Sequence, residues 1–462
     1  MYIDDTIAAI ATPPGIGGIG IIRISGFQAF AIIQKIFKSK QNKLLSDNTD
    51  RRIYYGHVYD NQTSQLVDEA IVLFMKGPRS YTAEDVVEIQ CHGGFVSVRK
   101  ILELVLHEGV RLAEPGEFTR RAFLNGRIDL VEAEAVIDII EAKTERSLSL
   151  AVDQLNGGLT NIIEPLRDRI LALIAKAEVT IDYPEEDIEK MTAEAVGEEL
   201  VEISKKLDDL LATAKTGKMI RDGVSVVIAG RPNAGKSSLL NAVIRENRAI
   251  VTDIPGTTRD SIEEYVTIEG IPIKLIDTAG IRDTEDTVEK IGVEKAKSYI
   301  DISDIVLYLI DGTTILSDED KNLLKKLSGK HCMVCINKAD IVRNARLKEE
   351  IKSRGSFYGV EFISAAEGVC PKAISDMIKH TVYEGSVVPS NTVMLSNIRH
   401  ISLVKSSLQD IDQALHMIKE RMPIDMVVTD IRSAWERLGE ITGKTVREEL
   451  TDELFSRFCL GK

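Results

Sequence analysis

One segment of the 462-residue chain restricts its fold more than any other: Gly230-Arg231-Pro232-Asn233-Ala234-Gly235-Lys236-Ser237. It has the spacing GxxxxGK[ST], follows an apolar run at 224–229 and precedes a helical run at 238–244. Glycines allow a tight loop whose backbone N–H groups converge on phosphate oxygens at the start of a helix. Lys236 then bridges the β- and γ-phosphates, and the Ser237 hydroxyl ligates Mg²⁺. The motif predicts a nucleoside-triphosphate site on an α/β domain.

Three further segments follow strand-like runs and predict which nucleotide is bound. Asp277-Thr278-Ala279-Gly280 offers a carboxylate to hold Mg²⁺ through a water, and the Gly280 N–H for the γ-phosphate. In Asn337-Lys338-Ala339-Asp340, the Asp340 carboxylate accepts hydrogen bonds from the N1–H and 2-amino groups of guanine. Adenine has neither donor, so GTP is favoured by about a hundredfold. The expected GTP-binding residues are Asn233, Ala234, Gly235, Lys236, Ser237, Ser238, Asp277, Thr278, Ala279, Gly280, Asn337, Lys338, Asp340, Ser364 and Ala365.

These segments together resemble the Ras-like superfamily of GTPases, with one departure. Ile281 stands where Ras-like enzymes commonly use a glutamine to orient the attacking water, and an apolar side chain cannot orient water. Catalysis therefore needs another polar group and another source of positive charge. Nearby candidates are Arg259, Arg282, Asp283, Glu285, Asp286 and Glu289.

Hydrophobic periodicity divides the chain into four regions. Residues 1–118 alternate strand-like runs with Gly and Pro, which indicates a mixed α/β domain. Residues 119–216 and 383–462 carry apolar positions at helical spacing. Between them, residues 217–382 alternate short strands with helices, which predicts a parallel, doubly wound sheet. We therefore expect an α/β unit inserted into one helical domain whose two halves pair.

Composition restricts the partners and the compartment. The 58 Lys+Arg and 72 Asp+Glu residues give a net charge of −14, so an RNA partner requires a local basic patch. No apolar run reaches the ~18 residues of a membrane span and no basic leader is evident, which predicts a cytoplasmic protein. Five cysteines predict reduced thiols. Cys332 and Cys335 are three positions apart on an expected strand, so their side chains face opposite sides of the sheet. We therefore expect them to be buried structural residues and not zinc ligands.

From end to end, the chain resembles the bacterial tRNA-modifying GTPases of the MnmE family, also called TrmE, in the TrmE–Era-type branch of the superfamily. The resemblance implies a multidomain α/β plus all-α fold. A Ras-like P-loop GTPase domain would be inserted into a helical domain, preceded by an α+β domain for folate binding and dimerisation. The matching segments are Ala11-Thr12-Pro13-Pro14-Gly15, Arg23-Ile24-Ser25-Gly26, Cys91-His92-Gly93-Gly94, Pro115-Gly116-Glu117-Phe118, Arg121-Ala122-Phe123-Leu124-Asn125, Gly256-Thr257-Thr258-Arg259-Asp260 and Cys459-Leu460-Gly461-Lys462.

The resemblance implies that potassium-dependent dimerisation of the GTPase domain replaces an arginine finger. A monovalent cation can neutralise transition-state charge, and Asn233 would be one of its ligands. Glu289 falls on the family's catalytic glutamate, which orients the attacking water through a second water, and Thr258 would complete the Mg²⁺ shell of Ser237. The other expected residues lie in the loop 252–257. Potassium would be bound by Thr252, Ile254 and Thr257, and GTP would be contacted also by Asp253, Pro255 and Gly256.

The resemblance also implies that the amino-terminal domain binds 5-formyl- or methylene-tetrahydrofolate as a one-carbon donor. The contacts map to Arg23, Glu88, Arg127 and Lys462. A carboxylate such as Glu88 suits the guanidine-like edge of a pterin, and cations suit the glutamate tail. Arg127 replaces a lysine found at this position in some members, which keeps the charge but changes the hydrogen-bond geometry. The resemblance also places Cys459 beside the folate and implies that this cysteine is needed for tRNA modification.

The function that the resemblance implies is a GTP hydrolase that modifies carbon 5 of the wobble uridine in tRNA, installing an aminomethyl or carboxymethylaminomethyl group. Its expected partners are a second copy of the chain, tRNA and the FAD-dependent protein MnmG (GidA), in a heterotetramer or larger complex. The rival is a regulatory GTPase switch in ribosome assembly, whose extra domains only dock RNA or protein. The GTPase motifs alone do not separate the two functions.

Two other motifs carry little weight. Residues 15–20 contain GxGxxG, but the run 19–24 that follows has strand character, whereas a dinucleotide fingerprint needs a helix. Cys459 is the fourth-last residue of the sequence, but Gly461 and Lys462 fit a prenylation motif poorly and no polybasic stretch precedes it. We therefore expect neither dinucleotide binding nor lipidation.

Overall fold

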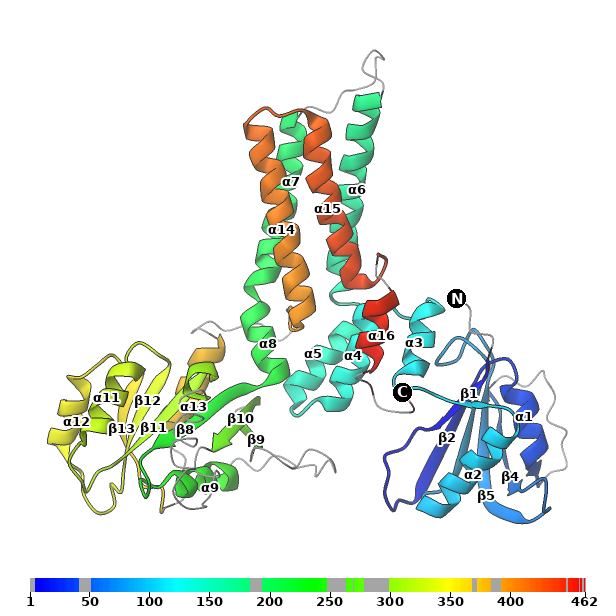
Figure 1. The fold of residues 1–462 in the computed structure, drawn as a ribbon, viewed down its shortest axis with the longest axis horizontal. Helices are drawn as coiled ribbons and strands as arrows, with labels where there is room; N and C mark the ends of the chain where they lie inside the picture. Colours follow the sequence, from blue (N-terminus) through cyan, green and yellow to red (C-terminus); the bar gives the residue numbers. More distant parts are fainter. Residues whose placement is uncertain are drawn as a thin grey trace. The chain divides into compact units, whose positions relative to one another are not determined.

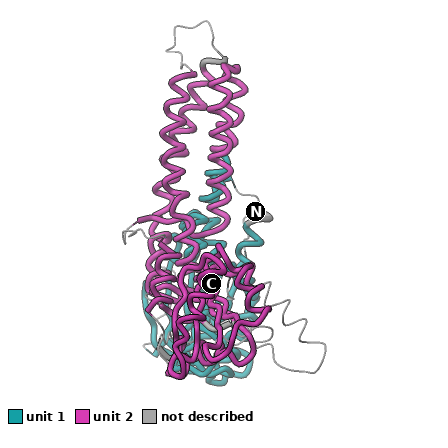
Figure 2. Tube along the Cα trace, turned by 90° about the vertical axis from the view of Figure 1, so that its left-hand side faces the viewer, with its two compact units in different colours: residues 1–137, 436–462 teal, residues 138–435 magenta. Residues whose placement is uncertain are grey.

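A computed structural model describes most of the chain, in two compact units. The units comprise residues 1–137 with 436–462, and residues 138–435 (Figure 2). This division does not test the four domain limits given above, which stay a prediction. The described residues are 5–40, 51–182, 193–246, 263–268, 270–277, 299–367, 372–383, 392–445, 448–456, 458 and 461.

The first unit contains a seven-stranded sheet with two helices packed on one face (Figure 1). Its elements are β1 (Ile7–Ile10), β2 (Ile19–Ser25), α1 (Ala29–Ile36), β3 (Phe37–Ser39), β4 (Ile53–Tyr59), β5 (Leu66–Met75), β6 (Val86–His92), α2 (Phe95–His107) and β7 (Arg111–Leu112). The strand order is β3-β4-β5-β6-β2-β1-β7, antiparallel throughout except for β1 and β7. Because side chains alternate along β2, Ile22 and Ile24 enter the core with α1 and α2, and Arg23 lies on the other face.

Three helices of the first unit form a separate small core. They are α3 (Glu117–Leu124), α4 (Leu130–Glu141), which continues into the second unit, and α16 (Glu448–Ser456). Ala122 and Leu130 pack there against Phe455 and Phe458. Near the carboxyl end, Gly461 has a φ of 91°, and a Cβ on it would lie 2.2 Å from the Ile10 carbonyl oxygen. Gly461 thus lies directly against the end of strand β1.

The second unit contains a six-stranded sheet with the order β13-β12-β11-β8-β10-β9. Its elements are β8 (Val224–Gly230), α9 (Lys236–Glu246), β9 (Glu263–Ile268), β10 (Ile271–Asp277), β11 (Ile305–Asp311), α11 (Asp318–Leu327), β12 (Cys332–Asn337), α12 (Ala345–Lys352), β13 (Gly359–Phe362) and α13 (Lys372–Tyr383). All neighbouring strands are parallel except β9 and β10. The expected doubly wound α/β unit is confirmed, but the antiparallel edge strand β9 was not foreseen.

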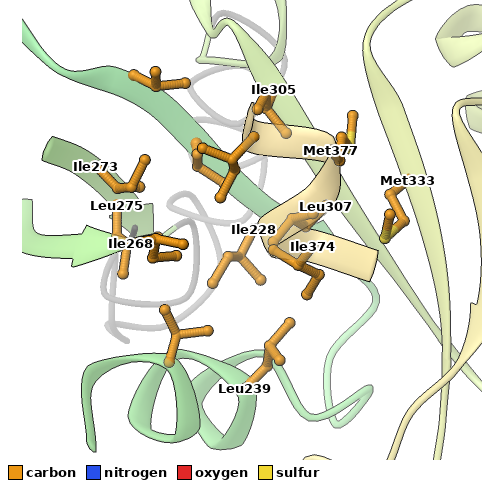
Figure 3. Packing of buried hydrophobic residues seen from close by; sticks show 14 of the residues in the cluster. Ile228, Leu239, Ile268, Ile273, Leu275, Ile305, Leu307, Met333, Ile374 and Met377 are labelled. Atoms are coloured by element: carbon orange, nitrogen blue, oxygen red, sulfur yellow. The ribbon is translucent and has the colours of Figure 1, made fainter. Parts of the chain in front are cut away.

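Both faces of this sheet are covered by helices, which explains its continuous apolar strands. On one face, Ile228 and neighbouring strand residues pack against Leu239 of α9 and Met377 of α13 (Figure 3). Helices α11 and α12 cover the other face. Cys335 belongs to the first of these cores and Cys332 to the second, and neither is in a disulfide. The prediction of two buried cysteines on opposite faces is therefore confirmed. Burial also raises the pKa of Cys332 to about 12.

The second unit also contains long helices from the chain segments that precede and follow the α/β insert in the sequence. They are α6 (Thr160–Asp182), α7 (Ala193–Ala212), α14 (Ile398–Lys419) and α15 (Ile424–Thr442), with the shorter α5 (Glu145–Leu155) and α8 (Ala214–Asp222). Helix α7 packs along α14 through a buried stripe that includes Leu200, Ile203 and Leu207 (Figure 1). The expected pairing of the two helical halves is therefore confirmed. In the described part of the chain, no helix combines the length and the apolar character of a membrane span.

Candidate functional site

The loop between β8 and α9 has the backbone that phosphate binding requires. Gly230 has a φ of 151°, and a Cβ there would lie 2.4 Å from the Leu309 carbonyl oxygen, so only glycine fits. The Lys236 ammonium donates hydrogen bonds to the carbonyl oxygens of Gly230 and Arg231, each at 2.9 Å. Ser237 is exposed in the first turn of α9. The lysine thus lies across the loop, where the phosphates of a nucleotide would replace these carbonyls as its partners.

Asn337 at the end of β12 joins three segments of the site. Its side-chain NH₂ donates to the Ala234 carbonyl oxygen at 2.7 Å, 103 residues away in the chain. The Ala365 N–H donates to its side-chain oxygen at 2.9 Å. Gly235 has a φ of 99°, and a Cβ there would lie 2.1 Å from the Asn337 amide nitrogen. The close packing of Gly235 on Asn337 therefore excludes any larger residue from this loop position.

Residues 337–340, which we call the base-reading segment because the sequence predicts that they select the base, are held in place by neighbouring side chains. The Ser364 hydroxyl donates to one oxygen of Asp340 at 2.8 Å. A pocket of about 240 Å³ beside this carboxylate is lined by residues that include Arg343 and Glu367. Lys338 has a left-handed φ of 63°, and its ammonium lies 2.5 Å from the carboxylate of Asp311. The structure thus brings Asp340 together with Ser364, as the sequence predicts, and adds Asp311.

Several sequence-predicted residues lie outside the described part of the chain. Asp277 ends β10, and its backbone pairs with Ile228 of β8, but its side chain is not described. The others are Thr252, Asp253, Ile254, Pro255, Gly256, Thr257, Thr258, Arg259, Thr278, Ala279, Gly280, Ile281, Arg282, Asp283, Glu285, Asp286, Glu289, Cys459 and Lys462. Their roles as GTP, Mg²⁺, potassium, folate or catalytic residues stay predictions.

A second candidate site lies in the first unit, on the sheet face opposite α1 and α2. Arg23 and Glu88 are cross-strand partners in β2 and β6, and their side chains pair at 2.8 Å. The rings of Tyr81 and Phe118 lie 4.8 and 5.6 Å from the Arg23 guanidinium carbon. The Arg127 guanidinium lies 4.8 Å from the same tyrosine ring. Three of the four residues expected at a folate site are thus brought together around Tyr81.

One nitrogen of Arg23 at this second site is free to donate a hydrogen bond to a ligand. Arg23 Nη1 is fully buried and has no hydrogen-bond partner among the described residues. A buried donor without a partner costs about 1–3 kcal/mol, so native proteins rarely leave one. Tyr81 was not foreseen, because its partners come from segments far apart in the sequence. Its hydroxyl shares a 2.8 Å hydrogen bond with Thr119, which fixes the ring.

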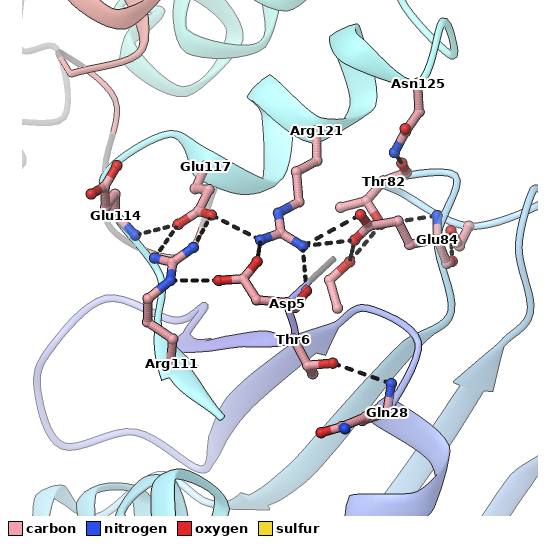
Figure 4. Close-up of polar contacts among 12 residues, drawn as sticks. Asp5, Thr6, Gln28, Thr82, Glu84, Arg111, Glu114, Glu117, Arg121 and Asn125 are labelled. Carbon is pink, nitrogen blue, oxygen red and sulfur yellow. Dashed lines mark hydrogen bonds and ion pairs between the residues drawn. The ribbon is translucent and has the colours of Figure 1, made fainter. Parts of the chain in front are cut away.

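Other segments that match the family prove to be structural. Glu117 and Arg121 of α3 are buried and pair with each other at 3.0 Å. Arg121 also pairs with Asp5 at 2.5 Å, and Arg111 pairs with both Asp5 and Glu117 (Figure 4). Hydrogen bonds from Arg111 and Arg121 lower the pKa of Glu117, although burial alone would raise it. This network fixes the start of β1 against α3.

Cys91 and His92 have different environments. Burial raises the pKa of Cys91 to about 11, so its thiol stays protonated and is no nucleophile at neutral pH. The exposed His92 ring contacts the Asp68 carboxylate at 2.6 Å, and this contact raises the pKa of the imidazole. Among the described residues, no group of three or more His, Cys, Asp or Glu side chains is arranged to hold a metal.

Comparisons with known proteins identify close relatives along the whole chain. A family model described as the MnmE helical domain matches residues 130–459, and one described as the GTP-binding protein TrmE N-terminus matches residues 6–127. A tRNA modification GTPase MnmE from Alkaliphilus oremlandii is 48% identical over 100% of both chains. The protein of the same name from Clostridioides difficile is 49% identical, again over 100% of both chains. A solved structure of Era from Aquifex aeolicus, bound to GDP·AlF₄⁻, covers 40% of this chain and 66% of its own, with 27% identity and a TM-score of 0.27.

Proposed function

The chain belongs to the MnmE family of tRNA modification GTPases, and on this basis we propose a potassium-activated GTP hydrolysis coupled to modification of carbon 5 of the tRNA wobble uridine. The enzyme hydrolyses GTP and acts in tRNA modification. The observation that carries the GTP site is the bridge made by Asn337 from Ala234 to Ala365. One side chain thereby holds the phosphate-binding and base-binding segments at a fixed spacing.

Hydrolysis at this site needs two functions that the described residues do not supply. Since Ile281 cannot orient a water, we assign that role to Glu289, in keeping with the family resemblance. Bound Mg²⁺ and K⁺ would neutralise charge that develops on the transferred phosphoryl group. Ser237 is exposed at the start of α9 and fits the Mg²⁺ site together with Thr258. Asn233 is exposed on the loop with a φ of 63°, and its amide oxygen suits K⁺; Thr252, Ile254 and Thr257 would supply its remaining ligands.

The Arg23–Glu88 pair fits one edge of a pterin. That edge presents a carbonyl oxygen beside a ring N–H and an amino group, so it needs one donor and one acceptor. The buried Arg23 Nη1 lacks an acceptor among the described residues, and the Glu88 carboxylate can take the two N–H donors. This match supports a tetrahydrofolate site formed by these two residues with Arg127 and, by resemblance, Lys462. A bound tetrahydrofolate derivative would supply the one-carbon unit.

The modification reaction needs partners beyond this chain. We propose a homodimer that acts with FAD-dependent MnmG in a heterotetramer or larger complex, with FAD held by MnmG and not by this chain. Cys459 is assigned to the modification chemistry by resemblance. Because tRNA is a cytoplasmic substrate, the same proposal places the enzyme in the cytoplasm. The net charge of −14 favours recognition of tRNA by a local basic patch or by the partner.

Nucleoside analysis separates modification from the rival role in ribosome assembly. In tRNA from a strain that lacks this protein, we expect loss of the 5-substituted wobble uridines and their return when the wild-type chain is supplied. A chain with Lys236→Ala should fail to restore them, because it lacks the phosphate-binding ammonium. Normal wobble nucleosides in the deletion strain, together with accumulated ribosomal precursors, would favour the assembly switch instead.

A further inference from the structure

Asp311 occupies a position that no sequence motif assigns, beside the base-reading segment. It ends β11, where the parallel register places it opposite Asn337 of β12. The neighbouring Gly312 donates its N–H to the Asn337 carbonyl oxygen at 3.0 Å. A Cβ on Gly312 would lie 2.7 Å from that oxygen. The two strand ends are therefore packed backbone against backbone, which fixes where the Asp311 side chain begins.

The Asp311 carboxylate is held on both of its oxygens. One oxygen accepts hydrogen bonds from the Thr313 backbone N–H at 2.9 Å and from the Thr313 hydroxyl at 2.6 Å. The other lies 2.5 Å from the Lys338 ammonium. Burial alone would raise the pKa of Asp311, but the hydrogen bonds from Lys338 and Thr313 lower it below its ordinary value. The carboxylate is therefore charged at neutral pH and fixed in orientation before any nucleotide binds.

The ion pair with Asp311 fixes the side chain of Lys338, which would otherwise sample several rotamers. Lysine loses about 1.5–2 kcal/mol of side-chain rotamer freedom when it is immobilised. The left-handed backbone of Lys338, at φ 63°, costs a non-glycine residue about 1 kcal/mol or more, so it persists only where its surroundings impose it. Here the surroundings are Asp340 with its Ser364 hydrogen bond on one side and Asp311 on the other. The lysine stem is thus ordered in advance.

We propose that Asp311 is a positioning residue for guanine-nucleotide binding, which holds the Lys338 ammonium so that the lysine stem forms a fixed wall of the base site. The inference rests on the proposed base site around Asp340. An ordinary surface ion pair contributes at most about 1 kcal/mol and has no effect on a ligand. Asp311 differs because its side chain is only 18% exposed and its partner belongs to the base-reading segment.

The test compares isosteric variants of two lysine-paired carboxylates in the same α/β insert. Asp311→Asn keeps the acceptor for Thr313 but removes the charge that holds Lys338. We expect about a tenfold loss of GDP affinity from faster release, with a raised KM for GTP and a kcat near wild type. Asp301→Asn is the matched control, since Asp301 pairs with Lys330 at 2.6 Å on the surface. It should leave GDP release unchanged.

A double-mutant cycle separates positioning from general stability. Lys338→Met keeps an apolar stem but cannot pair, so in this background Asp311→Asn should add little further loss of GDP affinity. Additive losses, or an unchanged GDP affinity in Asp311→Asn, would overturn the role of Asp311. The base site itself has a separate test: if Asp340→Asn keeps its preference for GTP over xanthosine triphosphate, the proposed site is wrong whatever Asp311 does.

Discussion

At the scale of single residues, the base site depends on one carboxylate whose orientation is set by hydrogen bonds. Ser364 occupies one oxygen of Asp340, so the remaining lone pairs are available to a base. Guanine and a carboxylate complement each other because two N–H donors meet two acceptor positions. A donor placed at the same position would repel guanine and attract a base with a carbonyl at position 2. In the proposed base site, the choice of nucleotide therefore rests on the chemistry of the Asp340 carboxylate.

Asp340→Asn provides the first prediction. The new amide offers an N–H donor, so preference should shift by about a hundredfold from GTP toward xanthosine triphosphate, whose 2-oxo group accepts it. Competition between the two nucleotides, measured with purified wild-type and variant chains, gives the ratio directly. Asp318→Asn, a change at a 91% exposed carboxylate of α11, is the matched control. A variant that still selects GTP would reassign the base-reading carboxylate.

Individual site residues could be predicted from the sequence where the motif fixes their place in the chain. Asp340 follows an apolar strand at a known spacing from the phosphate loop, and the carboxyl ends of parallel strands meet at one edge of the sheet. Asp311 follows a strand in the same way, but its partner Lys338 becomes evident only when β11 and β12 are in register. Tyr81 was missed for a related reason, since Arg23 and Arg127 reach it from separate segments.

At the scale of secondary-structure elements, α3 is held to the amino-terminal sheet mainly by buried charge. Arg121 is 4% exposed and reaches Asp5, Glu84 and Glu117. Breaking one partner of a buried ion pair leaves an uncompensated charge, which costs about 3–5 kcal/mol. The helix also begins after Gly116, whose φ of 70° and close approach to the Phe455 carbonyl oxygen exclude a side chain. The family-specific segments around α3 are thus explained by packing and charge.

Arg121→Met should destabilise α3 by about 3 kcal/mol, because it removes the buried one of the two cations that Glu117 and Asp5 share and leaves only the more exposed Arg111. Hydrogen exchange of α3 amides in the full chain measures this as a lower free energy of local opening. Arg99→Met is the control, since Arg99 is 64% exposed and pairs with Glu103 on the surface of α2. It should change the free energy of opening by less than about 1 kcal/mol. Equal protection of α3 in both variants would contradict the structural role of this network.

The same network makes α3 sensitive to acid. The pKa values of Glu117 and Asp5 are lowered in the folded chain from ordinary values of 4.5 and 3.8. Carboxylates of this kind stabilise the fold above their unfolded pKa, and the stabilisation is lost as pH falls through the folded pKa. Wild-type α3 should therefore lose exchange protection as pH falls below about 4.5, after correction for intrinsic exchange. In Arg121→Met the folded pKa values of Glu117 and Asp5 rise toward their unfolded values, so the loss of α3 protection on acidification should be smaller than in the wild-type chain.

The location of the strands in the sequence could be predicted better than the order and direction in which the strands pair. The runs at 224–229 and 305–310 are apolar except for Ser225, because helices cover both faces of the sheet, and this pattern can be read directly from the sequence. Edge strand β9 is harder to foresee, since Glu263–Ile268 is short and partly polar. Its antiparallel pairing with β10 begins at Ile268 and Ile271, which are too close in the sequence for a crossover helix between them. Glycine-rich residues 15–20 lead into a strand, as expected, and so make no dinucleotide fingerprint.

At the scale of the whole molecule, hydrolysis should depend on the salt and not only on this chain. We predict that GTP turnover is at least several-fold faster in potassium chloride than in sodium chloride at equal ionic strength. The reason is that Ile281 leaves the site without a water-orienting glutamine, and Asn233 offers an oxygen ligand to a cation that supplies positive charge. Asn233→Ala should remove the difference between the salts and leave GDP affinity largely intact. Equal rates of wild-type turnover in both salts would contradict potassium activation.

The two chemistries of the molecule should be separable, because the GTP site and the proposed modification residue lie in different parts of the chain. The GTP-binding motifs lie between 230 and 365, within the second unit, whereas Cys459 belongs to residues 436–462 of the first unit. Cys459→Ser keeps the approximate size of the side chain but removes the thiolate that a nucleophile requires. We therefore expect loss of wobble-uridine modification with GTP turnover near wild type, measured by nucleoside mass spectrometry and phosphate release on one preparation. Intact modification would rule out a functional thiol, and parallel loss of both activities would indicate misfolding.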